Sequence, residues 1–515
     1  MKIYKEFEEA KNGTLIPAFL SGKTMESRYN PQRDAQALCD TITGEEKFFL
    51  VLGVGSGLFL ELLSQKYPDA KIIAFELYDE DLAFLHTNER IKELSKNPLI
   101  LFAHLQNLEE LLIQNYLPAK YGNLKIVEQR VWVNENQNQI ENINSTLQKT
   151  LGIISADYSV QAHFGKIWAS NIMNNSLLAQ KHHLYSFESK ADILKKTAVI
   201  VAAGPTLDKT LSLLCDNNTR ENYFVISTDT AAQTLYKHAI TPEVIVSIDG
   251  QSVSYNHFIN QKKSGSTSQS GNPGQGGTSP VFAFDLCSNS SAARYVCEKD
   301  SNVFFFCSGH PLSSAINASN GYALPVIFSG AGTVTITAVD LAVQSGFEKL
   351  LILGADFSYS KGKAYSSGTY LDTLYNKDSS KLSKAEGTFS KLMFRTELKC
   401  LSQDVKTTEI LEAYKFSLEK YLTEKNITFS KEKDIYKLEC PPLTASSSDS
   451  QGIFTRAPAF SLKNFFNKLT ASSPEENEML LLPYVAWLRN NQQYQKLSYN
   501  ELLKLALDSI VSYNI

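Results

Sequence analysis

The sequence predicts a multidomain α/β protein built on parallel β-sheets, and three observations support this fold class. The chain has 515 residues, more than one core usually accommodates, so two or three domains are expected. Short runs rich in valine, isoleucine and phenylalanine alternate with segments of helical periodicity. These runs are apolar at nearly every position, which is typical of parallel strands buried on both faces between layers of helices.

Three domains are expected along the chain. The N-terminal domain, residues 1–175, is predicted to be Rossmann-like, because strand-like runs at 47–53 and 71–76 flank a helical stretch at 58–66 and a third run follows at 99–103. The C-terminal domain, residues 396–515, shows helical periodicity, as at 410–424 and 479–490, and few strand signals. It is predicted to be a helical layer that supports the other domains or binds a partner.

The central domain, residues 176–395, is predicted to contain the largest parallel sheet. Its expected strands lie at residues 197–203, 223–228, 244–248, 281–284, 303–306 and 349–353. The segment 262–280 is rich in glycine and serine and poor in apolar residues, so a flexible surface insertion is expected there.

Composition excludes several classes of protein. The chain is 43% hydrophobic and 20% charged with a net charge of −4, which argues against a nucleic-acid binder with a basic stripe. The acidic N-terminal segment differs from a signal peptide, and no apolar stretch approaches the length of about 18 residues that a membrane span needs. The seven cysteines are scattered without a C-x-x-C pair, which favours neither a zinc site nor a disulfide framework. We expect a cytoplasmic protein that binds neither nucleic acid nor membrane.

A glycine-rich turn follows the first predicted strand. Gly53, Gly55 and Gly57 separate this strand from a helix, and Glu76 ends the next strand. Rossmann-type proteins use this layout to bring the backbone against a nucleotide and to hold a ribose with the acid. A tight turn also requires glycine for steric reasons alone, so both interpretations remain open.

A second turn, in the sequence VIVAAGPTLD, begins the central domain. Gly204 removes a side chain at the strand end, Pro205 fixes φ, and Thr206 can cap the following helix. Because a helix N-terminus presents free N–H groups and partial positive charge, a phosphate-binding turn is predicted. A simple strand-to-helix turn is the alternative.

Acids also follow the next two strands. Thr228 and Asp229 lie in the sequence STDTA, and Asp249 lies in SIDG. Ligands of open α/β sheets bind at the carboxyl ends of the strands, so these side chains are predicted to converge on one site. Aspartate before threonine or glycine is also a common turn former.

The last part of the central domain contains two further motifs. Gly330, Gly332 and Thr333, in SGAGTVTITA, open a helix and provide another N-terminus suited to an anion. The sequence LGADFSYSKGKAY then places polar side chains after a strand, where they would steady a departing phosphate. The stabilising side chains are Tyr359, Lys363 and Tyr365, and Asp356 is the acid that follows the strand directly. Half-buried packing is the alternative role for the tyrosines.

Taken in order, these motifs resemble those of the motility-associated factor (Maf) family of bacterial flagellin glycosyltransferases. The central domain is also similar to bacterial sialyltransferases and to an archaeal hydroxymethylpterin diphosphokinase domain. The resemblance implies transfer of a nonulosonic, sialic-acid-like sugar from a CMP-activated donor to serine or threonine of flagellin. It also implies that the turn at 204–206 holds CMP, that Gly332 and Thr333 face the donor, and that Tyr359 and Tyr365 stabilise the leaving group.

The chain departs from the sialyltransferase pattern in its expected base. Those enzymes use a histidine after the tyrosine loop, whereas the last histidine here is His310. The candidates for the base are His310, His257, Asp249 and Asp356. The metal-binding D-x-D motif is absent at residues 228–230, so transfer without a required cofactor is expected, with Mg²⁺ as an option.

Two other functions are compatible with these motifs. A pterin diphosphokinase would use ATP, with Asp229, Asp249 and Asp356 as Mg²⁺ ligands. A non-catalytic flagellin-binding factor would have no need of the glycines and strand-end acids. The additional N-terminal and C-terminal domains favour the glycosyltransferase.

Overall fold

The computed structural model describes residues 2–181, 191–259, 280–299, 302–330, 332–377, 379, 393–394, 396–442 and 460–514. The insertion expected at 262–280 lies outside the described residues, apart from Pro280. The chain divides into two compact units, Met1–Gly165 with Leu482–Leu503, and Lys166–Leu481 with Lys504–Ile515. The long helix α8 (Gln137–Lys181) contributes residues to both units. In the described parts of the chain, we find no helix with the length and apolar character that a membrane span requires.

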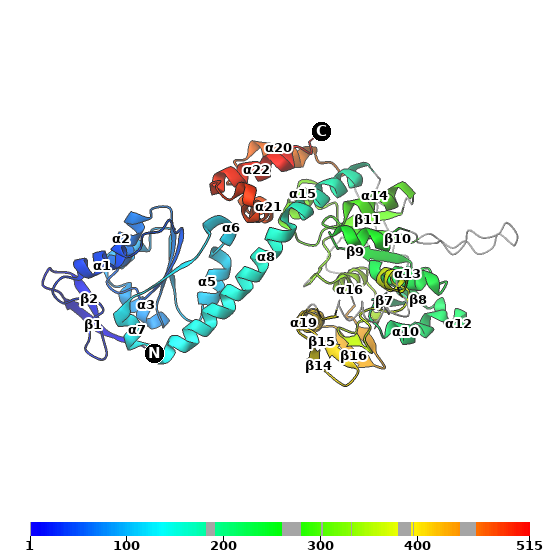
Figure 1. The fold of residues 1–515 in the computed structure, drawn as a ribbon, viewed down its shortest axis with the longest axis horizontal. Coiled ribbons are helices and arrows are strands. Elements are labelled where there is room, and N and C mark those ends of the chain that lie inside the picture. Colours follow the sequence, from blue (N-terminus) through cyan, green and yellow to red (C-terminus); the bar gives the residue numbers. More distant parts are fainter. Residues whose placement is uncertain are drawn as a thin grey trace. The chain divides into compact units, whose positions relative to one another are not determined.

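The first unit contains a four-stranded parallel sheet in the order β5-β4-β3-β6, which confirms the three strands expected there. Figure 1 shows the chain from its N-terminus to α8 in blue to cyan. An antiparallel pair, β1 with β2, precedes it. The strands are β1 (Tyr4–Glu9), β2 (Leu15–Phe19), β3 (Phe48–Leu52), β4 (Lys71–Phe75), β5 (Ile100–Ala103) and β6 (Lys125–Glu128). The helices before α8 are α1 (Pro31–Asp40), α2 (Leu58–Lys66), α3 (Asp79–Leu85), α4 (Glu89–Leu94), α5 (Leu108–Asn115), α6 (Pro118–Tyr121) and α7 (Arg130–Glu135).

The glycine turn between β3 and α2 is filled by side chains of the same unit. Glu76 accepts hydrogen bonds of 2.7 Å from the backbone N–H of Val54 and from Nε1 of Trp132. The backbone N–H of Ser56 donates to Glu26 Oε1 at 2.7 Å. Glu76 and the N–H groups of Val54 and Ser56, which a nucleotide would need, are therefore engaged within the protein. These contacts favour the steric interpretation of the glycines.

Two buried carboxyls at this turn predict that the first unit is more stable in mild acid. Burial raises the pKa of both Glu26 and Glu76 from 4.5 to about 7. The folded unit keeps these protons up to about pH 7, whereas the unfolded chain releases them near pH 4.5. The free energy of unfolding should therefore be largest below pH 4.5 and fall as the pH rises to 7, by up to about 3 kcal/mol per carboxyl.

Urea unfolding at pH 5 and pH 8 measures this effect. Of the three tryptophans, Trp132 and Trp487 belong to the first unit, so fluorescence in a Trp168→Phe background follows that unit alone. Glu26→Gln should flatten the pH profile. Equal stability at both pH values, or a profile that Glu26→Gln leaves unchanged, would contradict the prediction.

The second unit contains an eight-stranded sheet in the order β11-β10-β9-β8-β7-β12-β17-β16. Its first six strands are parallel and correspond to the six predicted for the central domain, which are thereby confirmed. The parallel strands are β7 (Thr197–Val201), β8 (Tyr223–Thr228), β9 (Val244–Ser247), β10 (Val281–Asp285), β11 (Val303–Phe306) and β12 (Lys349–Leu353).

Helices cover both faces of this sheet, as buried parallel strands require. On one face, α16 (Val334–Gln344) and α19 (Glu409–Glu424) share a core with strand residues such as Ile200 and Ile352. On the other, α10 (Leu207–Thr210), α11 (Ser212–Cys215) and α13 (Asp229–Lys237) pack on residues such as Val199. Among the described residues after α8, the other helices of either unit are α9 (Ala191–Leu194), α12 (Asn217–Arg220), η1 (Ser252–His257), α14 (Ser290–Lys299), α15 (Pro311–Ser319), α17 (Tyr370–Lys377), α20 (Lys463–Ala471), α21 (Glu478–Asn490), η2 (Gln492–Tyr494) and α22 (Tyr499–Val511).

The C-terminal segment is largely helical, as expected, but it also contributes strands that the sequence analysis did not locate. The antiparallel hairpin β16 (Thr428–Glu432) and β17 (Ile435–Glu439) extends the main sheet beyond β12. A small sheet joins β13 (Tyr359–Ser360) with β15 (Val405–Thr407) and β14 (Lys399–Cys400). These strands are short, and β16 is exposed along its whole length, so they lack the continuous apolar run that identified the other strands.

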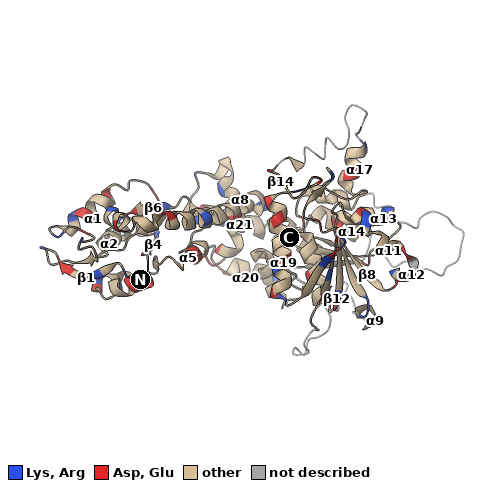
Figure 2. Cartoon of the chain, turned by 90° about the horizontal axis from the view of Figure 1, so that it is seen from below, with Lys and Arg blue, Asp and Glu red and all other residues tan. Residues whose placement is uncertain are grey.

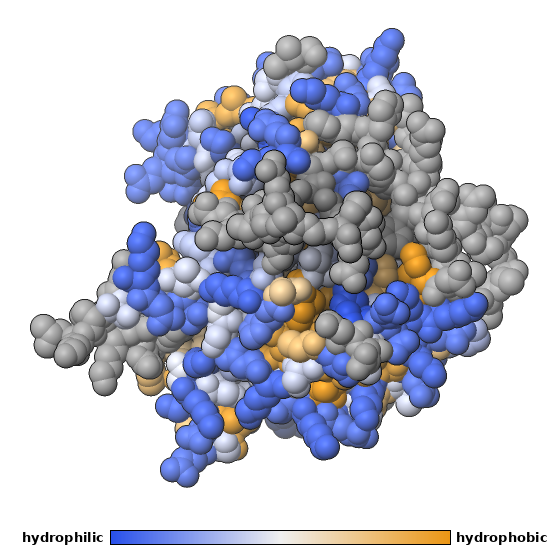
Figure 3. Space-filling view, turned by 90° about the vertical axis from the view of Figure 1, so that its right-hand side faces the viewer, coloured by the Kyte–Doolittle hydropathy of each residue, from blue (hydrophilic) through white to orange (hydrophobic). Residues whose placement is uncertain are grey.

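Charged residues of both signs are mixed along the described parts of the chain. In Figure 2, lysine and arginine residues are interspersed with aspartate and glutamate among the described residues. Figure 3 shows a largely hydrophilic described surface on the face that it presents, with apolar atoms in small separate areas.

Candidate functional site

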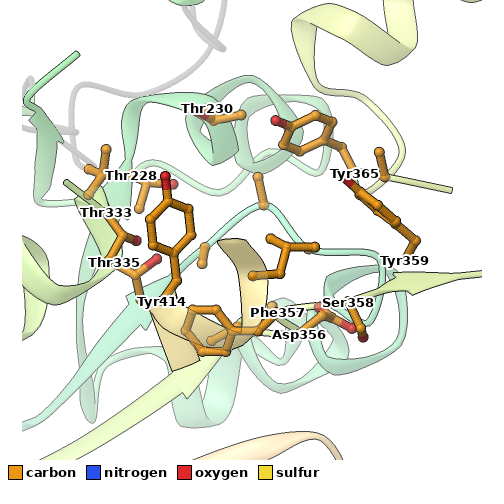
Figure 4. Close-up of a pocket in the computed structure, with 18 of the residues that line it drawn as sticks. Thr228, Thr230, Thr333, Thr335, Asp356, Phe357, Ser358, Tyr359, Tyr365 and Tyr414 are labelled. Atoms are coloured by element: carbon orange, nitrogen blue, oxygen red, sulfur yellow. The ribbon is translucent and has the colours of Figure 1, made fainter. Parts of the chain in front are cut away.

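A cavity of about 290 Å³ lies at the carboxyl end of the parallel strands in the second unit (Figure 4). Segments that follow β7, β8 and β12 line it, together with the start of α16 and one face of α19. Its lining consists of Ala202, Ala203, Gly204, Thr228, Thr230, Gly332, Thr333, Val334, Thr335, Gly354, Ala355, Asp356, Phe357, Ser358, Tyr359, Ala364, Tyr365, Leu411 and Tyr414. Among these described residues Asp356 is the single carboxylate, and none is lysine, arginine or histidine.

Asp356 caps the turn that opens the central domain. Its carboxylate accepts the backbone N–H of Thr206 at 3.2 Å and the Thr206 hydroxyl at 2.8 Å. The backbone N–H of Gly204 donates to the carbonyl of Gly354 at 2.8 Å, which joins the ends of β7 and β12. The N–H of Thr206, a donor expected for phosphate, is therefore bound to a carboxylate of the protein. Gly204 lines the cavity, whereas Pro205 and Thr206 lie outside its lining.

The N-terminus of α16 opens into the cavity instead. Thr333 is the N-cap residue and makes no side-chain capping bond, and the first N–H groups of a helix have no acceptor within the helix. Thr335 is 8% exposed, and its hydroxyl has no hydrogen-bond partner among the described residues. Gly332 also lines the cavity, while Gly330 packs against Ile336 and lies outside the lining. This helix end is the better position for an anion.

The loop after β12 contributes two tyrosines. Tyr359 and Tyr365 line the cavity and pack around Ala364. Burial raises the pKa of both phenols, and the neighbouring Tyr359 adds to the shift at Tyr365, so both remain neutral hydrogen-bond donors at physiological pH. Lys363 forms an ion pair with Asp208 at 3.4 Å and lies outside the lining.

The other predicted acids are not brought to the cavity lining. Asp229 is 1% exposed and accepts hydrogen bonds from the Thr230 N–H at 2.7 Å and the Ser247 hydroxyl at 2.6 Å. Asp249 accepts the backbone N–H of Gln251 at 2.9 Å, and burial raises its pKa. Within the described residues, no group of three or more acids, histidines or cysteines has an arrangement that could hold a metal ion.

The two histidine candidates for the base also lie outside this lining. His310 caps α15 through Nδ1, which accepts the Leu312 N–H at 3.2 Å, and its ring contacts Trp168. Burial lowers the pKa of His310 to about 4. The ring of His257 meets that of Tyr370 edge-on.

Several lining residues were not predicted from the sequence. Thr230 and Thr335 each lie two residues after a predicted site residue, Thr228 and Thr333. The repeated threonines at these helix starts could therefore have identified both as site residues. The others are Ala202, Ala203, Val334, Gly354, Ala355, Phe357, Ser358, Ala364, Leu411 and Tyr414. Tyr414 carries no local signal, because α19 reaches the cavity only through tertiary packing.

Comparisons with known proteins agree with this architecture. A sequence model described as "MptE-like: 6-hydroxymethylpterin diphosphokinase MptE-like" matches residues 169–362. The solved structure of a Maf glycosyltransferase from Magnetospirillum magneticum AMB-1 is similar, with a TM-score of 0.50, over 99% of this chain and 90% of that one, at 12% identity. The resemblances to the Maf family and to the hydroxymethylpterin diphosphokinase domain are thus confirmed, and the chain has the Maf glycosyltransferase fold.

Two proteins of Treponema pallidum (strain Nichols), each described as uncharacterized, are similar in sequence. Both are 29% identical to this chain, over 232 and 180 residues. The matches cover 45% and 35% of this chain, and 75% and 80% of the two relatives.

Proposed function

We propose that this protein is a cytoplasmic glycosyltransferase that moves a nonulosonic sugar from a CMP-activated donor to serine or threonine of flagellin, and that flagellar assembly and motility need it. The observation that carries the proposal is the cavity at the carboxyl end of the sheet, which gathers Gly204, Gly332, Thr333 and the loop from Asp356 to Tyr365. The Magnetospirillum protein of the same fold is a glycosyltransferase, which supports the class of reaction.

In the proposed reaction the bond between the anomeric carbon and a phosphate oxygen breaks, and CMP leaves with the electron pair. The developing charge on the phosphate requires hydrogen-bond donors aimed at it. The N-terminus of α16 and the hydroxyls of Tyr359 and Tyr365 supply such donors in the cavity. The described lining residues thus provide neutral hydrogen-bond donors that can stabilise an anion.

Asp356 is our candidate for the base that accepts the proton of the acceptor hydroxyl. It is the single carboxylate among the described lining residues, and burial raises its pKa, which strengthens it as a base. Hydrogen bonds from Thr206 fix the orientation of the carboxylate.

Substitution of Asp356 tests this assignment. Asp356→Asn keeps an oxygen that can accept from Thr206 but removes the base, so kcat for transfer from a CMP-sugar should fall by about 10²–10⁴-fold. Tyr365→Phe should lower kcat less, by about tenfold, through loss of one donor to the leaving phosphate. Thermal melting checks that both variants fold. A normal kcat in Asp356→Asn together with a lowered kcat in Asp249→Asn would move the base to Asp249.

Mass spectrometry of flagellin tests the acceptor. Flagellin from a strain that lacks this protein should be lighter by the mass of the attached sugars. An unchanged mass would contradict the proposal.

The match to the MptE-like model supports a second candidate, a pyrophosphoryl transferase that uses ATP and Mg²⁺. Its expected ligands were Asp229, Asp249 and Asp356, of which only Asp356 lines the cavity. Calorimetry with CMP and with ATP, each with and without Mg²⁺, separates the two. Magnesium-dependent ATP binding without CMP binding would favour the second candidate.

A further inference from the structure

Helix α19 supplies one wall of the cavity, although it lies outside the motifs that define the rest. Leu411 and Tyr414 are its lining residues. In Figure 4 the ring of Tyr414 stands on the side of Thr228, Thr333 and Thr335, whereas Tyr359 and Tyr365 lie on the opposite side. Tyr414 is thus on the side of the cavity formed by the start of α16.

A buried hydrogen bond holds α19 against α16. The hydroxyl of Tyr421 donates to Asp340 Oδ1 at 2.6 Å, and the backbone N–H of Phe328 donates to Asp340 Oδ2 at 2.6 Å. The Phe328 ring stacks on Tyr421 with centroids 5.4 Å apart. Tyr414 precedes Tyr421 by seven residues, or about two helical turns, so both point from one side of α19. The contacts that fix Tyr421 on α16 therefore also position Tyr414.

Among the described lining residues, the donors near the start of α16 are neutral. The described lining residues include no lysine or arginine. The Thr335 hydroxyl, on a side chain that is more than nine-tenths buried, has no partner among the described residues, and neither has the Tyr414 hydroxyl. Two side-chain donors thus face the same region as the free N–H groups of the helix.

We propose that Tyr414 is a substrate-binding residue that donates its phenolic O–H to a phosphate held at the N-terminus of α16, with Thr335 as the second side-chain donor. The identification of this phosphate as that of CMP rests on the proposed function. Hydroxyl and amide donors then bind the phosphate oxygens both in the CMP-sugar, where the phosphate is a diester, and in the CMP that leaves. Each donor should contribute a charge-assisted hydrogen bond.

Binding of CMP, cytidine and inorganic phosphate to the full chain tests the proposal. In Tyr414→Phe, calorimetry should show CMP affinity lowered by about ten- to a hundredfold, the range for a hydrogen bond to a charged group, with cytidine affinity unchanged. Thr335→Val should act in the same way, and Thr335→Ser should restore binding. Tyr322→Phe, at a tyrosine that is 71% exposed, is the matched control and should bind as the wild type does.

Three outcomes separate this inference from the proposed function. Equal losses of CMP and cytidine affinity in Tyr414→Phe would overturn it, because the tyrosine would then contact the nucleoside or support the fold. Unchanged CMP affinity would also overturn it, while leaving the transferase proposal intact. If the wild type binds neither CMP nor cytidine, the donor assignment fails. In that case, inorganic phosphate becomes the probe. Thermal stabilisation of the wild type by phosphate that is lost in Tyr414→Phe would still support the tyrosine's role. Equal stabilisation of the wild type and Tyr414→Phe would overturn the inference.

Discussion

Gly165→Ala should destabilise the first unit by about 3 kcal/mol, the upper part of the range for overpacked cores. Gly165 lies in α8, and a Cβ atom there would overlap the backbone carbonyl of Pro483 and lie 3.0 Å from the backbone nitrogen of Tyr484. Both neighbours are backbone atoms inside α21, so no side-chain rotation relieves the overlap. The two helices would have to move apart.

The same helix offers a matched control. Gly152 is exposed, and a Cβ atom there would meet nothing within 4 Å. Gly152→Ala should stabilise the unit by about 0.5–1 kcal/mol, the usual preference for alanine within a helix. Urea unfolding followed by fluorescence in the Trp168→Phe background measures both variants. If both substitutions shift the midpoint in the same direction by similar amounts, the close approach of α8 to α21 is not present in solution.

Much of the fold was predictable because parallel strands carry their signal locally. The six central strands are buried on both faces, so each appears in the sequence as a short apolar run, and all six lie in the main sheet. The β16–β17 hairpin was missed because its position at the edge of the sheet leaves β16 exposed. Edge strands lack the burial on which the sequence signal depends.

The candidate site was predictable only in part. Glycine turns and strand ends identified Gly204, Thr228, Gly332, Thr333 and Asp356, all of which line the cavity. The pairing of Asp356 with Thr206 joins residues 150 positions apart, so no local pattern shows that the carboxylate takes the place expected for a phosphate. Helix α19 forms a wall of the cavity only because it packs against α16, and no local sequence pattern shows this contact either.

The glycine turn of the first unit shows a further limit of local patterns. Its spacing is compatible with nucleotide binding, yet Glu26 and Trp132 come from segments on either side of the turn in sequence and fill the space around it. Whether such a turn is open or filled is decided by side chains far away along the chain.

Gly204→Ala should abolish sugar transfer, with a loss of at least about 10³-fold in kcat/KM, equivalent to about 4 kcal/mol of transition-state stabilisation. A Cβ atom at this position would overlap Asp356 Oδ2 and the carbonyl oxygen of Gly354, and would lie 2.8 Å from Cγ of Asp356. The carboxylate would have to leave Thr206, and the ends of β7 and β12 would separate at the point where both line the cavity.

A double-mutant cycle identifies the cause of this loss. If the methyl group acts by displacing the carboxylate, Gly204→Ala combined with Asp356→Ala should be less destabilised in urea than the sum of the two single variants. Transfer should remain absent in the double variant, because the proposed base is also gone. If the two stability losses simply add, the methyl group acts on the Gly354 carbonyl and not on the carboxylate. Wild-type turnover in Gly204→Ala would mean that the reaction takes place outside this cavity.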